Sequence, residues 1–248
     1  MSIYSNILQH KKEGRKQFAV LIDPDKANKQ KCETLACEAQ LAGVDLIFVG
    51  SSLLTRDDLD NSIKIIKQNC GIPVVLFPGS ILQISLFADA ILLLSLISGR
   101  NAEMLIGKQV IAAPLLKESK LEIISTGYML IDPGHPTSVS YMSNTFPIPH
   151  DKNDIALCTA LAGEQLGLKT IFMDAGSGAR VPVNKSMIEA VRKTISVPLI
   201  VGGGISSPEK ALENCNAGAD VVVIGNSIEK NQQLLTELAD AVHSFQTT

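Results

Sequence analysis

The sequence predicts an α/β protein with a single TIM-type (β/α)8 barrel over residues 1–248. Short apolar runs of strand length alternate with helical segments along the whole chain, as expected when parallel strands are each followed by a helix. No linker or change of composition divides the chain, and two glycine-containing turns follow consecutive late strands, at 202–204 and 225–227. A length of 248 residues suits one barrel, and two small domains are the less fitting alternative.

The composition indicates a well-packed protein and argues against two classes of partner. Hydrophobic residues make up 46% of the chain and charged residues 19%, so a large core can form. A net charge of -3 without a basic tract argues against nucleic acid. Residues 1–17 lack the apolar core of a signal peptide, and no apolar segment reaches membrane-spanning length. We therefore expect no transmembrane segment and a cytoplasmic location.

The five cysteines predict reduced thiols without a catalytic or metal-binding role. Their number is odd, none forms a Cys-x-x-Cys pair, and none lies in a histidine-rich cluster. Cys37 and Cys158 occur in helical segments, where we expect them to be small core residues.

Most of the expected strands end abruptly at glycine, proline, serine or aspartate. In a barrel of this type the carboxyl ends of all strands meet at one rim, where catalytic residues lie. The strand at 18–22 ends at Asp23, and the strand at 46–49 ends at glycine followed by two serines. The other expected strands lie at 74–77, 90–95, 127–131, 169–173 and 220–224, and in the apolar run that opens the stretch 197–206.

The helical segments alternate with these strands and include one irregular connection. Apolar residues recur at helical spacing in the segment 2–13, which we expect to cover the bottom of the barrel. The third connection, at 81–88, is short for a crossover helix and strongly apolar, so we expect irregular structure there. The other expected helices lie at 31–41, 57–69, 151–166, 185–194, 211–217 and 227–245, with a further helical stretch that ends near residue 117.

Two further segments predict contacts outside the barrel core. The helical stretch before residue 117 carries more apolar side chains than one helix face needs, which indicates either a subunit contact or the wall of an apolar groove. The loop after the fifth strand, which runs to residue 149, is long and rich in serine, asparagine and proline, as lids and binding loops are. The apolar residues of the helical stretch are Met104, Leu105, Ile106, Ile111, Leu115 and Leu116.

The stretch 197–206, VPLIVGGGIS, predicts an anion-binding turn. Its three glycines lack Cβ atoms, so their backbone N–H groups can approach a ligand closely. The next helix, capped by Ser206 or Ser207, adds the positive end of its dipole. One such turn alone is equally consistent with a tight turn, but a second one at 225–227 favours a shared phosphate site.

Polar residues at the strand ends predict a second ligand beside the phosphate. Asp23 and Ser52 follow the first two strands, and Asp174 follows the sixth. Mg²⁺ prefers oxygen ligands and often bridges one or two carboxylates to substrate phosphates, which suits Asp23. We expect a metal-bound diphosphate near Asp23 and a small phosphate ester on the later strands. Helix capping or a solvated loop is the alternative for Asp23 and Asp25, and helix capping for the hydroxyls.

Other barrel chemistries have no matching residues in this sequence. A Schiff-base aldolase needs a lysine inside the barrel, but Lys169 opens its strand and Lys26 lies beyond a strand end. The phosphate loop GxxxxGK followed by Ser or Thr is absent, which argues against nucleotide triphosphate chemistry. The histidines have no metal-ligand spacing and are expected to be solvated: His10, His135, His150 and His243.

Eight sequence motifs follow one another along nearly the whole chain. They are LIDPDK at 21–26, FVGSS at 48–52, LISGRN at 96–101, YMLIDPGHPTSV at 128–139, SNTFPIPHDK at 143–152, DAGSGA at 174–179, LIVGGGI at 199–205 and VVVIGNSIEK at 221–230. In this combination the chain resembles the geranylgeranylglyceryl phosphate synthase family, which includes the heptaprenylglyceryl phosphate synthases. The combination is specific, although GGGI and GN alone occur in many phosphate-binding barrels.

The resemblance implies an Mg²⁺-dependent prenyltransferase that joins sn-glycerol 1-phosphate to a polyprenyl diphosphate and releases pyrophosphate. Geranylgeranyl diphosphate is the expected prenyl diphosphate. It also implies a homo-oligomer, either a dimer or a hexamer. Asp23 and Ser52 match the family's Mg²⁺ positions, and we expect Asp174 to be catalytic. The residues that match the family's glycerol-phosphate site are Phe172, Met173, Asp174, Ala175, Gly176, Ser177, Gly178, Gly203, Gly204, Gly225 and Asn226.

The chain departs from the family pattern in two places. Phe172 and Asp174 stand where the family usually has Tyr and Glu, so a phenol is missing and the acid is one methylene shorter. A lysine common in the loop 132–136 is replaced by Pro-Gly-His, and we assign no catalytic role to His135. We expect Asp174 to bind the glycerol hydroxyls or to act as a base. The alternatives are a different acceptor, a phosphate-ester-binding barrel without catalysis, or another phosphate-binding barrel enzyme such as an isomerase or a flavin enzyme.

Overall fold

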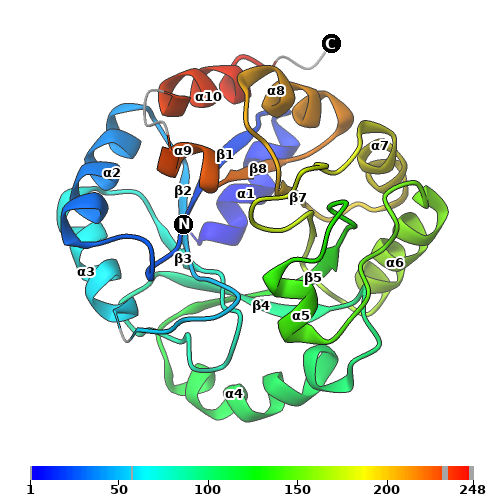
Figure 1. Cartoon of the computed structure of the whole chain (residues 1–248), viewed down its shortest axis with the longest axis horizontal. Coiled ribbons are helices and arrows are strands. Elements are labelled where there is room, and N and C mark those ends of the chain that lie inside the picture. The colour runs from blue at the N-terminus through cyan, green and yellow to red at the C-terminus, as the bar shows by residue number, and fades with distance from the viewer. Residues whose placement is uncertain (1, 57, 231–233, 246–248) are drawn as a thin grey trace.

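Eight parallel strands form one closed barrel with helices around its outside (Figure 1). The computed structural model describes residues 2–56, 58–230 and 234–245. Strands adjacent in sequence are adjacent in the sheet, and β8 pairs with β1 to close it, with Ala19 opposite Val223. The predicted (β/α)8 barrel is confirmed, and the carboxyl ends of its strands meet at one rim.

The strands lie where the sequence predicts them, except that β5 begins well before the expected residue 127. The first half of β5 combines Glu122, Ser125 and Thr126 with Ile123 and Ile124, so it lacks the continuous apolar run that identifies the other strands. It is stabilised instead by contacts at the bottom of the barrel, where the Thr126 hydroxyl lies 2.9 Å from the Thr170 hydroxyl. The strands are β1 (Gln17–Ile22), β2 (Leu46–Val49), β3 (Val74–Leu76), β4 (Ala90–Leu96), β5 (Glu122–Leu130), β6 (Thr170–Asp174), β7 (Leu199–Gly202) and β8 (Val221–Ile224).

The helices also follow the prediction, except that the loop expected up to residue 149 contains a short helix, α5, which begins at a capping box formed by Thr137 and Ser140. Two parts of the predicted helices, residue 57 and residues 231–233, lie outside the described residues. Within the described ranges, none of the helices has both the length and the apolar character needed to span a bilayer. The helices are α1 (Ile3–Lys12), α2 (Lys29–Leu41), α3 (Leu59–Asn69), η1 (Glu103–Gly107), α4 (Lys108–Glu118), α5 (Ser138–Ser143), α6 (Asn153–Gln165), α7 (Lys185–Thr194), α8 (Pro208–Ala217), α9 (Asn226–Lys230) and α10 (Leu234–His243).

The connections on either side of β4 are irregular. Between β3 and β4, residues 77–89 form turns and extended chain without a helix, as expected from the short apolar segment at 81–88. After β4 the helical stretch begins as a π-helix, η1, which the sequence did not predict. The Ser95 hydroxyl donates a 2.7 Å hydrogen bond to the Leu105 carbonyl in this wide turn. π-turns are frequent at functional sites, and η1 borders the apolar groove described below.

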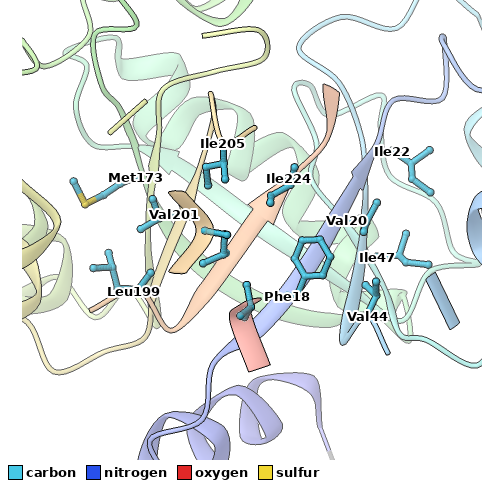
Figure 2. Close-up of a cluster of buried hydrophobic side chains, with 14 of the residues drawn as sticks. Phe18, Val20, Ile22, Val44, Ile47, Met173, Leu199, Val201, Ile205 and Ile224 are labelled. Carbon is cyan, nitrogen blue, oxygen red and sulfur yellow. The ribbon is translucent and has the colours of Figure 1, made fainter. Parts of the chain in front are cut away.

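Alternate residues of each strand face opposite sides of the barrel wall. Phe18, Val20 and Ile22 of β1 belong to the buried layer between the strands and the helices, part of which is drawn in Figure 2. Ala19 faces the other way, into the barrel, where a second cluster contains the large side chains Phe48 and Phe172. The barrel interior is therefore a packed core with its open space confined to the rim.

Helix α1 closes the bottom of the barrel, as the sequence predicts. Ile7 is almost fully buried and packs into the inner cluster. The Glu122 carboxylate, at the start of β5, accepts hydrogen bonds from the N–H groups of Ile3 at 2.6 Å and Tyr4 at 3.0 Å. These bonds satisfy orphan donors at the start of the helix and fix it to the sheet.

The cysteine prediction is wrong for two side chains. Cys32 and Cys215 are buried, but Cys37 and Cys158 are exposed. Both lie in helices whose apolar residues are mostly small and are not confined to one clear stripe, so the sequence pattern did not separate the inner face from the outer one.

Asp220, just before β8, anchors the bottom of the barrel wall. Its Oδ2 accepts hydrogen bonds from Arg192 Nη1 and from the Leu199 N–H, both at 2.9 Å. Lys16 Nζ lies 3.6 Å from its Oδ1. The carboxylate is nearly buried and is contacted from α7, from β7 and from the segment before β1.

Asp220→Ala is therefore expected to lower the free energy of unfolding by about 2–4 kcal/mol, because it leaves the buried N–H of Leu199 without its acceptor and the Arg192 guanidinium without its carboxylate partner. Urea denaturation would measure the change. Glu33→Ala is the control, since its ion pair with Lys29 is exposed and 3.8 Å long, and exposed pairs contribute less than about 1 kcal/mol. Equal losses in the two variants would contradict the anchoring role.

Candidate functional site

A polar cavity of about 480 Å³ lies at the carboxyl-end rim of the barrel. It is lined from β1 and β2 on one side and from β6, β7 and β8 on the other. Residues far apart in the sequence, such as Asp23 and Asn226, thus share one site. The predicted site residues that line it are Asp23, Ser52, Phe172, Asp174, Gly176, Ser177, Gly178, Gly203, Gly204, Gly225 and Asn226.

Two of the predicted substrate-binding residues, Met173 and Ala175, lie outside this cavity. Both are fully buried in the outer layer between strands and helices, and Figure 2 shows Met173 in that layer beside Leu199. The reason is the two-residue alternation of the strand, which turns Phe172 and Asp174 inward and their neighbours outward. A contiguous motif therefore does not make a contiguous binding surface.

Gly203 and Gly204 form the predicted phosphate turn after β7. Their φ angles are +85° and +72°, which residues with a Cβ rarely adopt. A Cβ on Gly203 would also lie 2.7 Å from Asp174 Oδ1 and 2.7 Å from the Gly176 nitrogen. Helix α8 follows with Ser207 as its N-cap, so that one of the two candidate caps is confirmed. The N–H groups of this turn and the helix dipole favour an anion here.

Hydrogen bonds join this turn to the loops after β6 and β8. The Ser227 hydroxyl donates to the Ile205 carbonyl at 2.8 Å, which ties the start of α9 to the glycine turn. The Ser177 hydroxyl donates to Asn226 Oδ1 at 3.1 Å. Three loops therefore form one unit around the expected phosphate position.

Asp174, the last residue of β6, lies in the floor of the cavity with only 7% of its surface exposed. Its Oδ1 accepts the Gly176 N–H and its Oδ2 accepts the Tyr128 hydroxyl, both at 2.7 Å. Burial raises the pKa of Asp174, and the hydrogen bonds from Tyr128 and Gly176 offset part of that rise. The arrangement favours a carboxylate that can take up a proton.

Tyr128 is a site residue that the sequence analysis missed. It belongs to β5, is paired with Phe172 of β6, and points into the barrel. Its burial raises its pKa well above the usual value, and the adjacent Asp174 carboxylate raises it further, so Tyr128 remains a proton donor. Strand alternation could have identified it: in the strand at 127–131, Tyr128 lies two residues before Leu130 and therefore faces the same side, the inside of the barrel.

Asp23 occupies the opposite side of the cavity. Its Oδ2 lies 3.2 Å from Lys26 Nζ and accepts the Ser51 hydroxyl, also at 3.2 Å. Ser52 lines the cavity beside it. Asp25 points elsewhere and accepts hydrogen bonds from the Thr55 N–H and hydroxyl at 2.6 and 2.9 Å, so it stabilises the neighbouring loop.

The donor set around Asp23 fits a magnesium ion that is completed by substrate oxygens. Within the described ranges, no group of three or more histidine, cysteine, aspartate or glutamate side chains could hold a metal by itself. Mg²⁺ commonly uses one or two carboxylates and takes further oxygens from water and phosphate. Asp23 with the hydroxyl of Ser52 offers that kind of partial site.

A second, apolar groove of about 120 Å³ adjoins the polar cavity. Leucines of β4, Met104 of η1 and Leu116 of α4 form its walls. The two spaces share four lining residues, Ser51, Ser52, Phe77 and Val139. This groove accounts for one face of the apolar stretch before residue 117.

The other face of that stretch lies on the surface. Ile106, Val110 and Ile111 are each more than 60% exposed, at 61%, 64% and 62%. Both explanations left open by the sequence thus have a structural counterpart: one face lines a groove, and the opposite face is free for a contact.

The fold and the site define a (β/α)8 barrel in which a polar cavity with a glycine turn suited to an anion adjoins an apolar groove. The PcrB family model matches residues 9–243. The chain belongs to the PcrB family.

Known relatives and solved structures agree with this assignment. Geranylgeranylglyceryl phosphate synthase of Chitinophaga pinensis is 58% identical over 98% of this chain and 96% of its own. The synthase of Flavobacterium johnsoniae is 46% identical over 93% of this chain and 95% of its own. A crystal structure of (S)-3-O-geranylgeranylglyceryl phosphate synthase from Thermoplasma acidophilum with sn-glycerol-1-phosphate covers 99% of this chain and 100% of its own, with a TM-score of 0.94 and 34% identity. The resemblance seen in the motifs is confirmed.

Gly203→Ala is expected to weaken the binding of sn-glycerol 1-phosphate at least about tenfold, because the new Cβ collides with Asp174 and costs about 1–2 kcal/mol of backbone strain. Titration calorimetry would measure the affinity. Gly167→Ala is the matched control: its φ of +87° imposes the same strain, but nothing lies within 4 Å of its Cβ. Equal affinities in the two variants would contradict the assigned phosphate turn.

Proposed function

We propose that this protein is an Mg²⁺-dependent prenyltransferase that joins sn-glycerol 1-phosphate to geranylgeranyl diphosphate through an ether bond and releases pyrophosphate. The observation that carries the proposal is the junction of a polar, phosphate-binding cavity with an apolar groove at Ser51, Ser52 and Phe77. The two proposed substrates differ in polarity as the two spaces do, because the phosphate ester is polar and the isoprenoid chain is apolar. The names of the relatives, which are 46–58% identical, support the same reaction.

The later strands are suited to the acceptor substrate. The glycine turn at 202–204 and the loops tied by Ser177 and Ser227 hold the phosphate, as their N–H groups and helix N-termini favour an anion. The glycerol hydroxyls then face Asp174. As the 3-hydroxyl oxygen bonds to the first prenyl carbon and the bond from that carbon to the diphosphate breaks, Asp174 takes the hydroxyl proton.

The early strands are suited to the leaving group. Asp23 and Ser52 would hold Mg²⁺, which neutralises charge on the departing diphosphate when it is bound. Lys26, now 3.2 Å from Asp23, is placed to contact the diphosphate oxygens. The leucines of the apolar groove hold the prenyl chain and exclude water from the reacting carbon.

Two further expectations concern the whole protein. The exposed apolar face formed by Ile106, Val110 and Ile111 supports the homo-oligomer, dimer or hexamer, that the resemblance implies. We also propose that the protein is located in the cytoplasm, as expected from the sequence.

Purified protein with Mg²⁺, labelled sn-glycerol 1-phosphate and a series of polyprenyl diphosphates is expected to yield a prenylated ether, and chelation by EDTA is expected to stop its formation. Thin-layer chromatography after phosphatase treatment would detect the product and its chain length. No ether with any diphosphate would defeat the proposal. Tight glycerol-phosphate binding without turnover would favour a binding barrel, and a yellow protein would favour a flavin enzyme.

Asp23→Asn is expected to reduce Mg²⁺-dependent turnover at least about 100-fold, because it removes the only carboxylate expected at the metal, while the affinity for sn-glycerol 1-phosphate stays unchanged. Steady-state kinetics and calorimetry would measure the two effects. Asp132→Asn is the control, since Asp132 also follows a strand but does not line the cavity. Turnover equal to that of the unmodified protein would refute the role of Asp23.

A further inference from the structure

The Tyr128–Asp174 hydrogen bond crosses the boundary between the two substrate spaces. Tyr128 lines the apolar groove, whereas Asp174 lines the polar cavity. Their side chains meet at 2.7 Å. The pair thus lies where the acceptor hydroxyl and the first prenyl carbon have to meet if the proposed reaction takes place.

The aromatic side chains around Tyr128 hold its ring in one orientation. Phe77 lies edge-on to it with ring centroids 5.8 Å apart, and Phe172 lies edge-on at 5.7 Å. Phe77 and Phe172 stack on each other at 5.1 Å. With the ring enclosed in this way, the Tyr128 hydroxyl is preorganised toward Asp174 and loses little freedom in the bond.

Asp174 retains acceptor capacity for a ligand. Tyr128 and Gly176 each use one acceptor position, one on each carboxylate oxygen. A carboxylate offers about four such positions. Further acceptor positions therefore remain on a side chain that lines the cavity, and the two existing bonds decide in which direction they point.

The register of β5 and β6 brings the phenol to the acid. Tyr128 stands opposite Phe172, which has no hydroxyl, and reaches Asp174 from the neighbouring strand. A phenol thus contacts the carboxylate from residue 128.

We infer that Tyr128 is a positioning residue for the prenyl transfer: its hydroxyl orients Asp174 so that the free carboxylate lone pairs accept the proton of the glycerol hydroxyl. The inference rests on the proposed function. Tyr128 itself transfers no proton in this scheme, since it remains a donor to the carboxylate throughout.

Tyr128→Phe tests the inference, because it removes one oxygen and keeps the ring. The turnover number is expected to fall about 10- to 100-fold, as for a misplaced general base, with little change in the KM for the prenyl diphosphate. The hydrogen bond from Tyr128 lowers the pKa of Asp174. Its loss raises that pKa, so the acid limb of the pH–rate profile is expected to move to higher pH.

The carboxyl ¹³C chemical shift of Asp174 gives the same pKa without turnover. Its titration is expected to move to higher pH in Tyr128→Phe, so the inference can be judged even if the unmodified protein forms no ether. The other charged side chains that line the cavity, Asp23, Lys26 and Arg180, are unchanged in this comparison. Tyr141→Phe, on an exposed tyrosine, is the control and is expected to leave both profiles unchanged.

The double variant Tyr128→Phe, Phe172→Tyr supplies a rescue test. The tip of the Phe172 ring lies against Gly202, which is paired with Asp174, so a hydroxyl added there is expected to lie on the same side of the barrel as the carboxylate. Part of the lost turnover is expected to return. An unmoved pKa of Asp174 in Tyr128→Phe would overturn the inference, as would a turnover loss that the double variant does not recover.

Discussion

The closure of the barrel between β8 and β1 is the constraint on which the site depends. Parallel pairing around the full circle places the carboxyl ends of all strands at one rim. Asp23 after the first strand and Gly225 after the last consequently line one cavity. The same pairing fixes which side chains face inward, and a slip of one residue in β6 would move Asp174 to the helix side of the wall.

The inward aromatic residues divide the space below that rim. Tyr128 of β5, Phe172 of β6 and Phe77, which directly follows β3, form a contiguous group. On one side they border the apolar groove, and on the other they lie beside the buried carboxylate of Asp174. Because the surroundings are apolar, each hydrogen bond to that carboxylate has a larger effect on its position and its pKa than it would have in water.

Much of this arrangement could be predicted from the sequence, and the exceptions have physical reasons. The strand ends and the glycine turn are local features, so Asp23 and Gly203 were recognisable from their neighbours along the chain. Met173 was assigned to the site because it is part of a motif, but strand alternation turns it outward. Cys37 was placed in the core because the apolar residues of its helix do not form one clear stripe that marks the inner face.

The sequence by itself determined the order of strands and helices, and with it the barrel and the residues at its rim. These follow from patterns of two to four residues and from local turn chemistry. Only the tertiary structure decided that Tyr128 reaches Asp174 and that the polar cavity meets the apolar groove. Such contacts depend on the register between neighbouring strands and on how large side chains fill the barrel, which are set by the closed sheet as a whole rather than by any segment of the chain.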